Sequence, residues 1–486
     1  MMLTAADLVT LLPLILVGTT AVVAMLAIAW HRHHAGTALI AGIGLVLALL
    51  ILPVAYTGSP PLMQVDGLAQ MASTLILLSA LVTVILSHHY LTGYIGPQEE
   101  FYLLVLCATA GALGLVASDH LAMLFISLEL LSMPLYGMLA YSLRAERSLE
   151  AGIKYLLLSA AATAFLLFGM ALIYARTGYL DLAGIAGAIA HGPDVWMLAG
   201  GALILVGLGF KLSVVPFHLW TPDVYQGGPA PATIFLATVS KLAVFVVLLR
   251  LVLSAPIYES DWLQAVITVL ALLTMLGGNL LALFQSNLKR LLGYSSIAHF
   301  GYLLVAIAVG NALGVEATGV YLVTYLVTTL AAFGVVTLVS SPFGGEDADG
   351  LPLYRGLFWR RPYLAAVMTV SFLSLAGIPL TAGFIGKFYV IALGVADSRW
   401  WLVGGVVAGS AIGLYYYLRV MVTLYLPEPG MRRRDVTNDW GSRLGGITLV
   451  TLAIVILVFG IYPAPMIDWV QDLGVSAASA SGAWRG

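Results

Sequence analysis

The feature that most constrains this chain is a series of apolar stretches, each about 20 residues long, that recurs along the whole sequence. A helix of this length crosses the hydrocarbon core of a bilayer. Hydrophobic residues make up 61% of the 486 residues and charged residues only 9%, whereas a soluble domain carries about 25% charged residues. The sequence therefore predicts an all-α polytopic membrane protein.

We expect about fourteen transmembrane helices with short, turn-like connections. Only residues 341–362 and 427–443 are long enough to form real loops. The first apolar stretch has no basic residue before it and is too long for the core of a signal peptide, so we expect an uncleaved first span. The predicted helices lie near residues 8–30, 35–56, 67–89, 101–118, 119–142, 151–176, 195–225, 229–254, 262–284, 289–310, 315–340, 363–393, 400–426 and 444–472.

Composition excludes several classes of function. The net charge of −2 gives no reason to expect a nucleic-acid partner. Cys107 is the single cysteine, so neither a disulfide framework nor a cysteine-held cluster can form within the chain. The sequence has no dinucleotide fingerprint. His31, His33 and His34 resemble a metal cluster, but they lie between spans with no carboxylate nearby, and we expect no metal there.

Basic residues are distributed unevenly between the two sets of loops. Three lie on one side, at Arg176, Arg399 and Arg485. Twelve lie in the loops after odd-numbered helices: Arg32, Arg144, Arg147, Lys289, Arg290, Arg355, Arg360, Arg361, Arg432, Arg433, Arg434 and Arg443. Basic loops stay in the cytoplasm, so we expect both termini on the outer side.

Four charged residues lie near the middle of predicted helices, namely Glu129, Lys211, Lys241 and Lys387. Each unpaired charge costs roughly 3 kcal/mol at the centre of a membrane helix. One interpretation is that the four form structural ion pairs between helices. Three lysines and one glutamate cannot neutralise one another as fixed pairs, however, and at least two lysines must be neutral, hydrated or transiently paired. The other interpretation is a path of groups that take up and release protons.

Two of these lysines lie near prolines that interrupt a helix. Pro216 follows Lys211, and Pro379 precedes Lys387 in the stretch LAGIPLTAGFIGKFY. Broken helices at membrane depth survive only where they line a cavity or are covered by protein. Two such helices, five helices apart, indicate two repeats of opposite topology, helices 4–8 and 9–13. The chain then divides into residues 1–100, 101–254 (first repeat), 262–426 (second repeat) and 427–486.

Three further polar residues are secondary candidates for a proton path. His299 lies within a predicted helix, and either a hydrated relay or a histidine satisfied in the core would explain it. His218 follows Pro216 and could extend the path outward. Glu150 and Lys154 are spaced i,i+4, which is typical of a simple helix pair, with proton uptake as the alternative.

Three long stretches resemble the antiporter-like membrane subunits of respiratory complex I. These are GLGFKLSVVPFHLWTPDVYQGGPAPATIFLATVSK (207–241), NLKRLLGYSSIAHFGYLL (287–304) and SLAGIPLTAGFIGKFYV (374–390). The resemblance covers nearly the whole chain and is weakest in 1–95 and 427–486. It implies fourteen helices, two inverted five-helix repeats and one proton pathway driven by quinone reduction elsewhere in the complex. It also implies that Glu129 matches the carboxylate of helix 5, and that Lys211, Lys241 and Lys387 match the charges of helices 7, 8 and 12.

The resemblance implies a bacterial inner-membrane location and, as partners, other membrane subunits of the complex, sister antiporter-like subunits and the lipid bilayer. We expect no cofactor in this chain, with flavin and iron–sulfur clusters in partner subunits and quinone bound elsewhere. A subunit of a multisubunit cation/proton antiporter is the alternative. A third interpretation is a scaffold that only fills the membrane arm.

Overall fold

The structure is a computed structural model that describes residues 4–55, 58–94, 96–143, 145–190, 192–254, 261–310, 312–340, 347–427 and 440–481. Helices dominate these residues, and they contain no β-strand. The helices of the first half are α1 (Ala5–Thr10), α2 (Leu12–Trp30), α3 (His34–Ile51), α4 (Gly67–Thr92), α5 (Glu99–Val116), α6 (Leu121–Leu139), α7 (Glu146–Thr177), α8 (Leu182–Ala190), α9 (Val195–Leu212), α10 (Trp220–Gly227), α11 (Ala230–Phe235), the π-helical turn η1 (Leu236–Ser240) and α12 (Lys241–Ser254).

The second half continues the same pattern. Its helices are α13 (Asp261–Leu283), α14 (Leu288–Val309), α15 (Ala312–Val339), the 3₁₀ turn η4 (Leu351–Tyr354), α16 (Leu357–Arg360), α17 (Pro362–Ala376), α18 (Ala382–Ala396), α19 (Trp400–Tyr425), α20 (Trp440–Ile461) and α21 (Ala464–Ser481).

Thirteen helical stretches among the described residues are long and apolar enough to cross a membrane. The shorter apolar helices α17 and α18, 15 residues each, follow one another and together fill the place of the predicted helix 363–393. The prediction of an all-α polytopic membrane protein with about fourteen spans is therefore confirmed.

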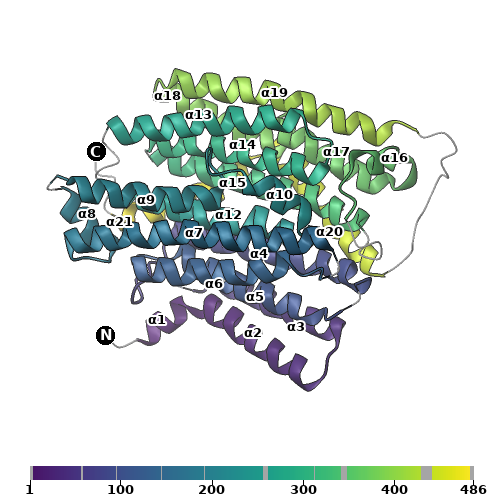
Figure 1. Cartoon of the computed structure of the whole chain (residues 1–486), viewed down its shortest axis with the longest axis horizontal. Helices are drawn as coiled ribbons and strands as arrows, with labels where there is room; N and C mark the ends of the chain where they lie inside the picture. The colour runs from purple at the N-terminus through teal and green to yellow at the C-terminus, as the bar shows by residue number, and fades with distance from the viewer. Residues whose placement is uncertain are drawn as a thin grey trace.

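The long helices lie side by side in one bundle, with the chain running back and forth between its two ends (Figure 1). The α2–α3 connection, α16 and the start of α20 lie at one end, and α1 and α8 lie at the other. We call the first the basic end, because its described residues include Arg32, Arg147, Lys289, Arg290, Arg355, Arg360, Arg361 and Arg443. We call the other the far end; Arg176 and Arg399 lie there.

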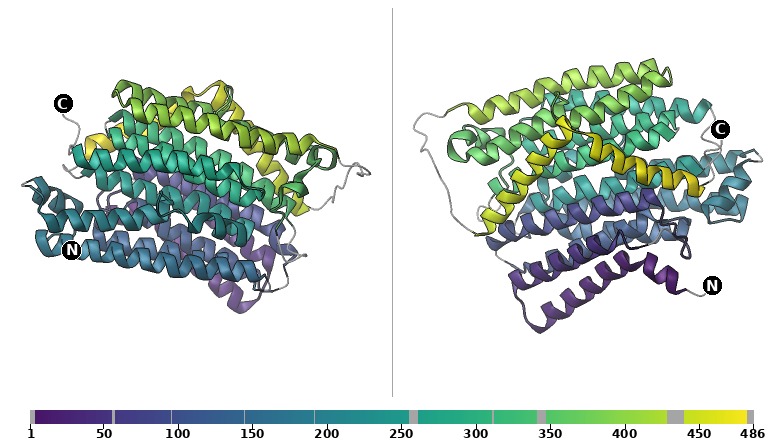
Figure 2. Two further views of the ribbon diagram at one scale, coloured as in Figure 1. Left: turned by 45° about the horizontal axis from the view of Figure 1, so that its top comes forward. Right: turned by 180° about the vertical axis from the view of Figure 1, so that it is seen from behind.

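The centre of the bundle is formed by the stretch Ala230–Ser254 and by α14, whose spanning segments are completely buried, and by the almost completely buried α15. In α2 and α20, by contrast, only 22% of each spanning segment is buried, as expected of helices that face lipid. Figure 2 shows α20 and α21 crossing the back of the bundle at an angle to each other. The polar residues described below are thus enclosed by apolar helices.

Both predicted broken helices are interrupted. Helix α9 ends at Leu212, Ser213 adopts a left-handed conformation (φ 63°), and α10 begins at Trp220, so that Pro216 lies in the break. Helix α17 ends at Ala376 and α18 begins at Ala382, with Pro379 between them. Lys211 precedes its break and Lys387 follows its own. The two lysines therefore lie on opposite sides of their breaks.

Four details differ from the sequence predictions. The predicted helix 444–472 is two helices, because Pro463 and Pro465 cannot continue the hydrogen bonding of α20. The predicted helix 229–254 contains the π-helical turn η1. The predicted helix 8–30 is divided between α1 and α2. Lys289, which we placed among loop residues, is only 1% exposed because residues 347–351 pack over it.

Candidate functional site

Lys211 lies in the last turn of α9, where the break exposes the helix end to neighbouring helices. Its side chain is 2% exposed. The ammonium Nζ donates hydrogen bonds to the hydroxyls of Ser132 on α6 (2.6 Å) and Ser159 on α7 (2.7 Å). Ser159 also bonds the hydroxyl of Tyr136 (2.8 Å). The ammonium is therefore held by neutral hydroxyl groups from two other helices.

Glu129 lies on the same face of α6 as Ser132, because the two residues are three positions apart. Its Oε1 accepts a hydrogen bond from the hydroxyl of Thr163 (3.0 Å), which lies one turn beyond Ser159 on α7. The carboxylate and the ammonium of Lys211 thus share the α6–α7 interface, with hydroxyl groups as their bonded neighbours. This arrangement places a negative charge beside the lysine without a fixed ion pair.

Lys241 is the first residue of α12 and directly follows the π-helical turn η1, a feature often found at functional sites. Its side chain is completely buried. Nζ donates to the hydroxyl of Ser296 on α14 (3.0 Å), and Ser296 bonds the hydroxyl of Tyr325 on α15 (2.7 Å). The rings of Tyr225 and Phe300 lie 5.6 and 5.1 Å from Nζ, within the range of cation–π attraction.

Lys387 lies on α18 and reaches back across its own break. Nζ donates to the carbonyls of Leu375 (2.9 Å) and Ala376 (3.0 Å), which end α17. The carbonyls at the C-terminus of a helix carry partial negative charge and favour a cation. The ring of Tyr302 lies 5.4 Å from Nζ. The first half of the broken helix, α17, thus supplies the acceptors for the lysine of its second half, α18.

His299 lies on α14, one turn beyond Ser296, and is buried. Its Nδ1 bonds the hydroxyl of Tyr321 (2.7 Å), and its Nε2 lies 3.3 Å from the hydroxyl of Tyr417, which also bonds Ser295. A small cavity adjoins the ring and is also lined by Tyr321, Thr324, Tyr325, Thr328, Ser374, Leu375 and Gly383. Because Tyr325 belongs to the Lys241 network and Leu375 bonds Lys387, the cavity connects the surroundings of the two lysines.

The interpretation as fixed ion pairs does not describe the three lysines. Among the described residues, no carboxylate lies within 4 Å of the ammonium of Lys211, Lys241 or Lys387. Hydroxyls, carbonyls and aromatic rings surround them instead. A neutral amine still has N–H groups to donate to the hydroxyls and carbonyls, although more weakly, and its loss of a proton leaves no ion-paired carboxylate without its partner.

Glu150 belongs to an ionic network at the basic end. Lys154 bonds Glu150 (2.6 Å) and Asp223 (3.1 Å), and Asp223 also bonds Arg290 (2.6 Å). These side chains, except that of Arg290, line an open pocket. The i,i+4 helix pair predicted for Glu150 and Lys154 is thus present, and Lys154 also bonds Asp223 of α10.

The remaining predicted candidates are histidines. His218 is buried in the break, on the α10 side of Pro216. His33 caps α3 by accepting from Gly36, and His34 bonds the hydroxyl of Tyr102 (2.6 Å). The described part of the chain contains no group of three or more His, Cys, Asp or Glu side chains that could hold a metal ion.

Two buried charge pairs escaped the sequence analysis. Arg250 on α12 donates two hydrogen bonds to Asp66, the N-cap residue of α4, both 2.9 Å long. Lys289 on α14 lies 2.6 Å from Asp347. In each pair the two residues are distant in sequence and lie near helix ends. At such positions the sequence alone indicates an ordinary charged loop residue. Only the chain's tertiary packing reveals that they are buried.

Comparison with known proteins shows which family this chain resembles. Residues 118–413 match the sequence profile described as NADH:quinone oxidoreductase/Mrp antiporter, TM. The chain is similar to NADH-quinone oxidoreductase subunit N of Chromohalobacter salexigens, with 65% identity over 96% of this chain and 98% of the relative.

Two solved structures share the fold. A chain of respiratory complex I from Thermus thermophilus with bound aureothin is 35% identical, with a TM-score of 0.81 over 94% of this chain and 98% of that chain. A chain of the Mrp complex from Dietzia sp. DQ12-45-1b has a TM-score of 0.85 over 99% of both chains, but at 20% identity it shows likeness of fold alone.

Proposed function

This chain belongs to the NADH:quinone oxidoreductase/Mrp antiporter family, and we propose that it is subunit N of respiratory complex I and itself carries protons across the membrane. The proton path consists of Glu129, Lys211, Lys241 and Lys387. The observation that carries this proposal is the surroundings of the three lysines, which are buried and bonded to neutral groups. Each lysine can exchange a proton without breaking an ion pair.

The order of the groups suggests a route. Protons enter from the cytoplasm near the break of α9 and α10, and Lys211 stores them beside Glu129. They pass to Lys241, cross the hydroxyl groups and the small cavity at His299, and leave by way of Lys387. The hydroxyls of Ser296 and Tyr325 can take part because a hydroxyl both donates and accepts.

The energy for this movement comes from quinone reduction elsewhere in the complex. This chain supplies no redox group of its own: Cys107 is its single cysteine, and the sequence contains no dinucleotide motif. Its partners are the other membrane subunits, including sister antiporter-like subunits, and flavin and iron–sulfur clusters reside in other chains. The 65% identity to a subunit N favours this role over that of a cation/proton antiporter subunit, for which the likeness to the Mrp complex is one of fold.

The uneven distribution of basic residues supports an orientation in a bacterial inner membrane. The basic end faces the cytoplasm, and both termini face outward. The two predicted inverted repeats, 101–254 and 262–426, then place one broken helix in each half of the chain. Their opposite topology gives the path one half-route on each side of the membrane.

Replacement of Lys211 tests the proposal. Lys211→Met keeps most of the apolar stem but cannot bind a proton, so coupled quinone reduction and proton pumping should both fall sharply in an assembled complex. Lys211→Arg keeps a charge that cannot be released near neutral pH, because the pKa of arginine is about 13. Arg should therefore also impair pumping. Pro216→Ala should be milder than either, because the proton site remains.

The measurement is proton uptake by inside-out membrane vesicles, normalised to the amount of assembled complex. Arg355→Met is the matched control, because Arg355 is exposed at the basic end and outside the path. If the Arg variant pumps like the parent complex, Lys211 is only a fixed positive charge and the carrier role is wrong. If the Met variant also pumps normally, the chain is a scaffold.

A further inference from the structure

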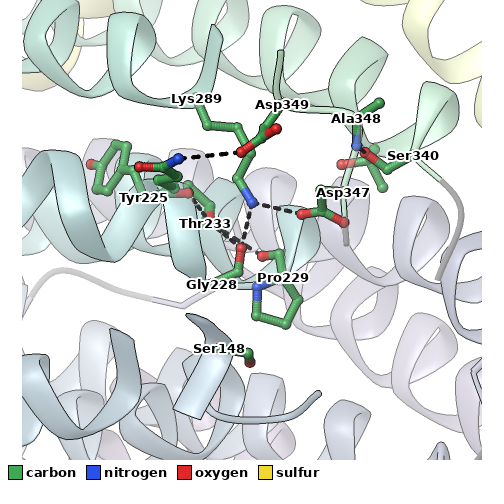
Figure 3. Close-up of polar contacts among 12 residues, drawn as sticks. Ser148, Tyr225, Gly228, Pro229, Thr233, Lys289, Ser340, Asp347, Ala348 and Asp349 are labelled. Atoms are coloured by element: carbon green, nitrogen blue, oxygen red, sulfur yellow. Dashed lines mark hydrogen bonds and ion pairs between the residues drawn. The ribbon is translucent and has the colours of Figure 1, made fainter. Parts of the chain in front are cut away.

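Lys289, the second residue of α14, is a buried lysine that the proposed proton path does not use. It lies at the basic end and is 1% exposed. Its Nζ donates to the carbonyl of Gly228 (2.5 Å) and to Oδ2 of Asp347 (2.6 Å) (Figure 3). The other oxygen of Asp347 accepts from the hydroxyl of Tyr90 on α4 (2.7 Å). Lys289 is therefore paired with a carboxylate, unlike the three lysines of the path.

The carboxylate of Asp347 is held in place by the segment that carries it. We call residues 347–351 the Asp347 segment. Its main chain is hydrogen bonded to the start of α14, from the Leu288 N–H to the Asp349 carbonyl (2.6 Å) and from the Leu351 N–H to the Ser286 carbonyl (3.1 Å). The Asn287 side chain donates to Asp349 (2.5 Å). The Asp347 segment and the start of α14 therefore form one unit.

A tyrosine fixes the same segment from the other side. The hydroxyl of Tyr354 donates to the carbonyl of Ala348 (2.6 Å). Burial, together with the charges of Asp347 and Asp349, raises the pKa of Tyr354 well above its usual range. The phenol therefore stays protonated and can donate to Ala348 throughout the physiological pH range.

The other partner of Lys289, Gly228, is the C-cap residue of α10. The neighbouring Arg290 donates to Asp223 (2.6 Å) and to Gln226 (3.1 Å), both on α10. Thr233 of α11 also approaches the Gly228 carbonyl (3.4 Å). Two consecutive residues at the start of α14 thus hold the last turns of α10, which leads directly into the helix that carries Lys241.

Helix α10 is also closely packed against α6 and α7. A Cβ atom at Gly227 would lie 2.4 Å from the main-chain oxygen of Arg147, and one at Gly228 would lie 2.6 Å from Leu139. The α10 backbone therefore lies directly against α6 and the start of α7. The position of α10 therefore depends on contacts on two sides. On the side facing α14, these contacts come from the charged side chains of Lys289 and Arg290.

Helix α10 lies between the two lysines of the first repeat. Its Trp220 packs against Tyr155 (4.9 Å between ring centres), whose ring lies 5.7 Å from the ammonium of Lys211. Its Tyr225 lies 5.6 Å from the ammonium of Lys241. A movement of α10 would therefore change the aromatic surroundings of both lysines together.

We propose that Lys289 and Asp347 are a positioning pair: they hold α10 between Lys211 and Lys241, so that protons pass from one lysine to the other. This inference rests on the proposed function. The pair acts through α10 and does not carry protons itself. It also makes the second half of the chain, which supplies Lys289 and Asp347, necessary for proton transfer in the first half.

The test uses the complete complex with three variants, Lys289→Met, Asp347→Asn and the two combined. Each single variant leaves a buried group without its partner and can reduce assembly. The double variant removes both charges and avoids that penalty, but it leaves the Gly228 carbonyl without its cation. We expect the double variant to assemble, to pump protons several-fold more slowly per assembled complex, and to show a changed pH profile of pumping. Arg355→Met is the control for loss of a basic residue at this end and should match the parent.

Other results would overturn the inference. Parental pumping and an unchanged pH profile in the double variant would show that the two charges only compensate each other. Failure of all three variants to assemble would make the pair a folding element. A lower amount of assembled complex, with parental pumping and a parental pH profile per complex, would also make the pair a folding element. A purely structural role changes the amount of complex and not its pH profile.

A Lys241→Met variant distinguishes this inference from the proposed function. If Lys241→Met pumps like the parent, the proton path itself is wrong. If Lys241→Met is impaired while the double variant of Lys289 and Asp347 pumps normally, the path stands and only the positioning role fails.

Discussion

The three lysines of the proposed path each place the ammonium against a different set of neutral acceptors. Lys211 donates to two serine hydroxyls, Lys241 to one serine hydroxyl, and Lys387 to two main-chain carbonyls. In each site the acceptors come from a different helix or half-helix from the one that carries the lysine. Small movements between helices can therefore change how strongly each site holds its proton, and this is what a driven pathway requires.

Glu129 is predicted to tune Lys211 and not to hold the fold. Glu129→Gln keeps the shape of the side chain and its ability to accept from Thr163, but it removes the negative charge beside the ammonium. We expect normal assembly, pumping reduced several-fold, and a pH profile displaced toward acidic pH, because the protonated lysine loses a stabilising neighbour. Proton uptake by vesicles, followed as a function of pH, measures this.

The matched control is Glu146→Gln, which removes an exposed carboxylate from the first turn of α7. It should leave both rate and pH profile unchanged. If Glu129→Gln prevents assembly, the carboxylate is part of a structural interaction and the tuning role is wrong.

Charges at mid-depth could be found from the sequence, whereas buried charges near helix ends could not. Glu129, Lys211, Lys241 and Lys387 are conspicuous because the surrounding residues are apolar in both directions. Lys289 looks like a loop residue, because its burial depends on Asp347, 58 positions away. Its partner residues come together only through the packing of distant segments. Likewise, no sequence pattern connects Arg250 with Asp66.

At the scale of elements, the two interrupted helices each carry a proline at the break and a lysine of the proposed proton path. Pro216 and Pro379 predicted the positions of both breaks, because proline cannot donate the hydrogen bond that a continuous helix needs. The π-helical turn η1 before Lys241 has no comparable marker: Leu236–Ser240 contains neither proline nor glycine. No local residue marks this turn, so it could not be predicted from the sequence.

The break of α17 and α18 depends on Gly377, which has a left-handed backbone (φ 82°). A Cβ atom there would lie 2.8 Å from Cδ of Lys387. We expect Gly377→Ala to destabilise the break by about 1–2 kcal/mol, because a left-handed conformation is unfavourable for alanine. It should also displace Lys387 and lower pumping although every charge remains.

Thermal inactivation of the assembled complex and proton uptake at ordinary temperature give the two measurements. Gly404→Ala on α19 is the matched control, since no heavy atom lies within 4 Å of a Cβ placed there and alanine favours a helix. Equal behaviour of the two alanine variants would contradict the role assigned to the break.

At the scale of the whole molecule, the uneven distribution of basic residues predicts the orientation. Arg355 is exposed at the basic end, and Pro193 is exposed at the far end beside the start of α9. In a Cys107→Ser background, Pro193→Cys should react with a membrane-impermeant thiol reagent in intact cells. Arg355→Cys should react only in inside-out vesicles. The opposite labelling pattern would reverse the orientation and exchange the sides of proton uptake and release.

The contacts of Lys387 have a consequence for the mechanics of the chain. Its ammonium satisfies the last two carbonyls of α17, so the order of that helix end and the occupancy of the proton site are two aspects of one equilibrium. Loss of the proton weakens the cap and lets the last turn of α17 loosen. By the same reciprocity, any pull that draws α17 away from α18 makes the lysine release its proton more readily. On the proposed path, the break is therefore a transducer, in which tension along a helix and the chemical potential of the proton are exchanged at a single side chain.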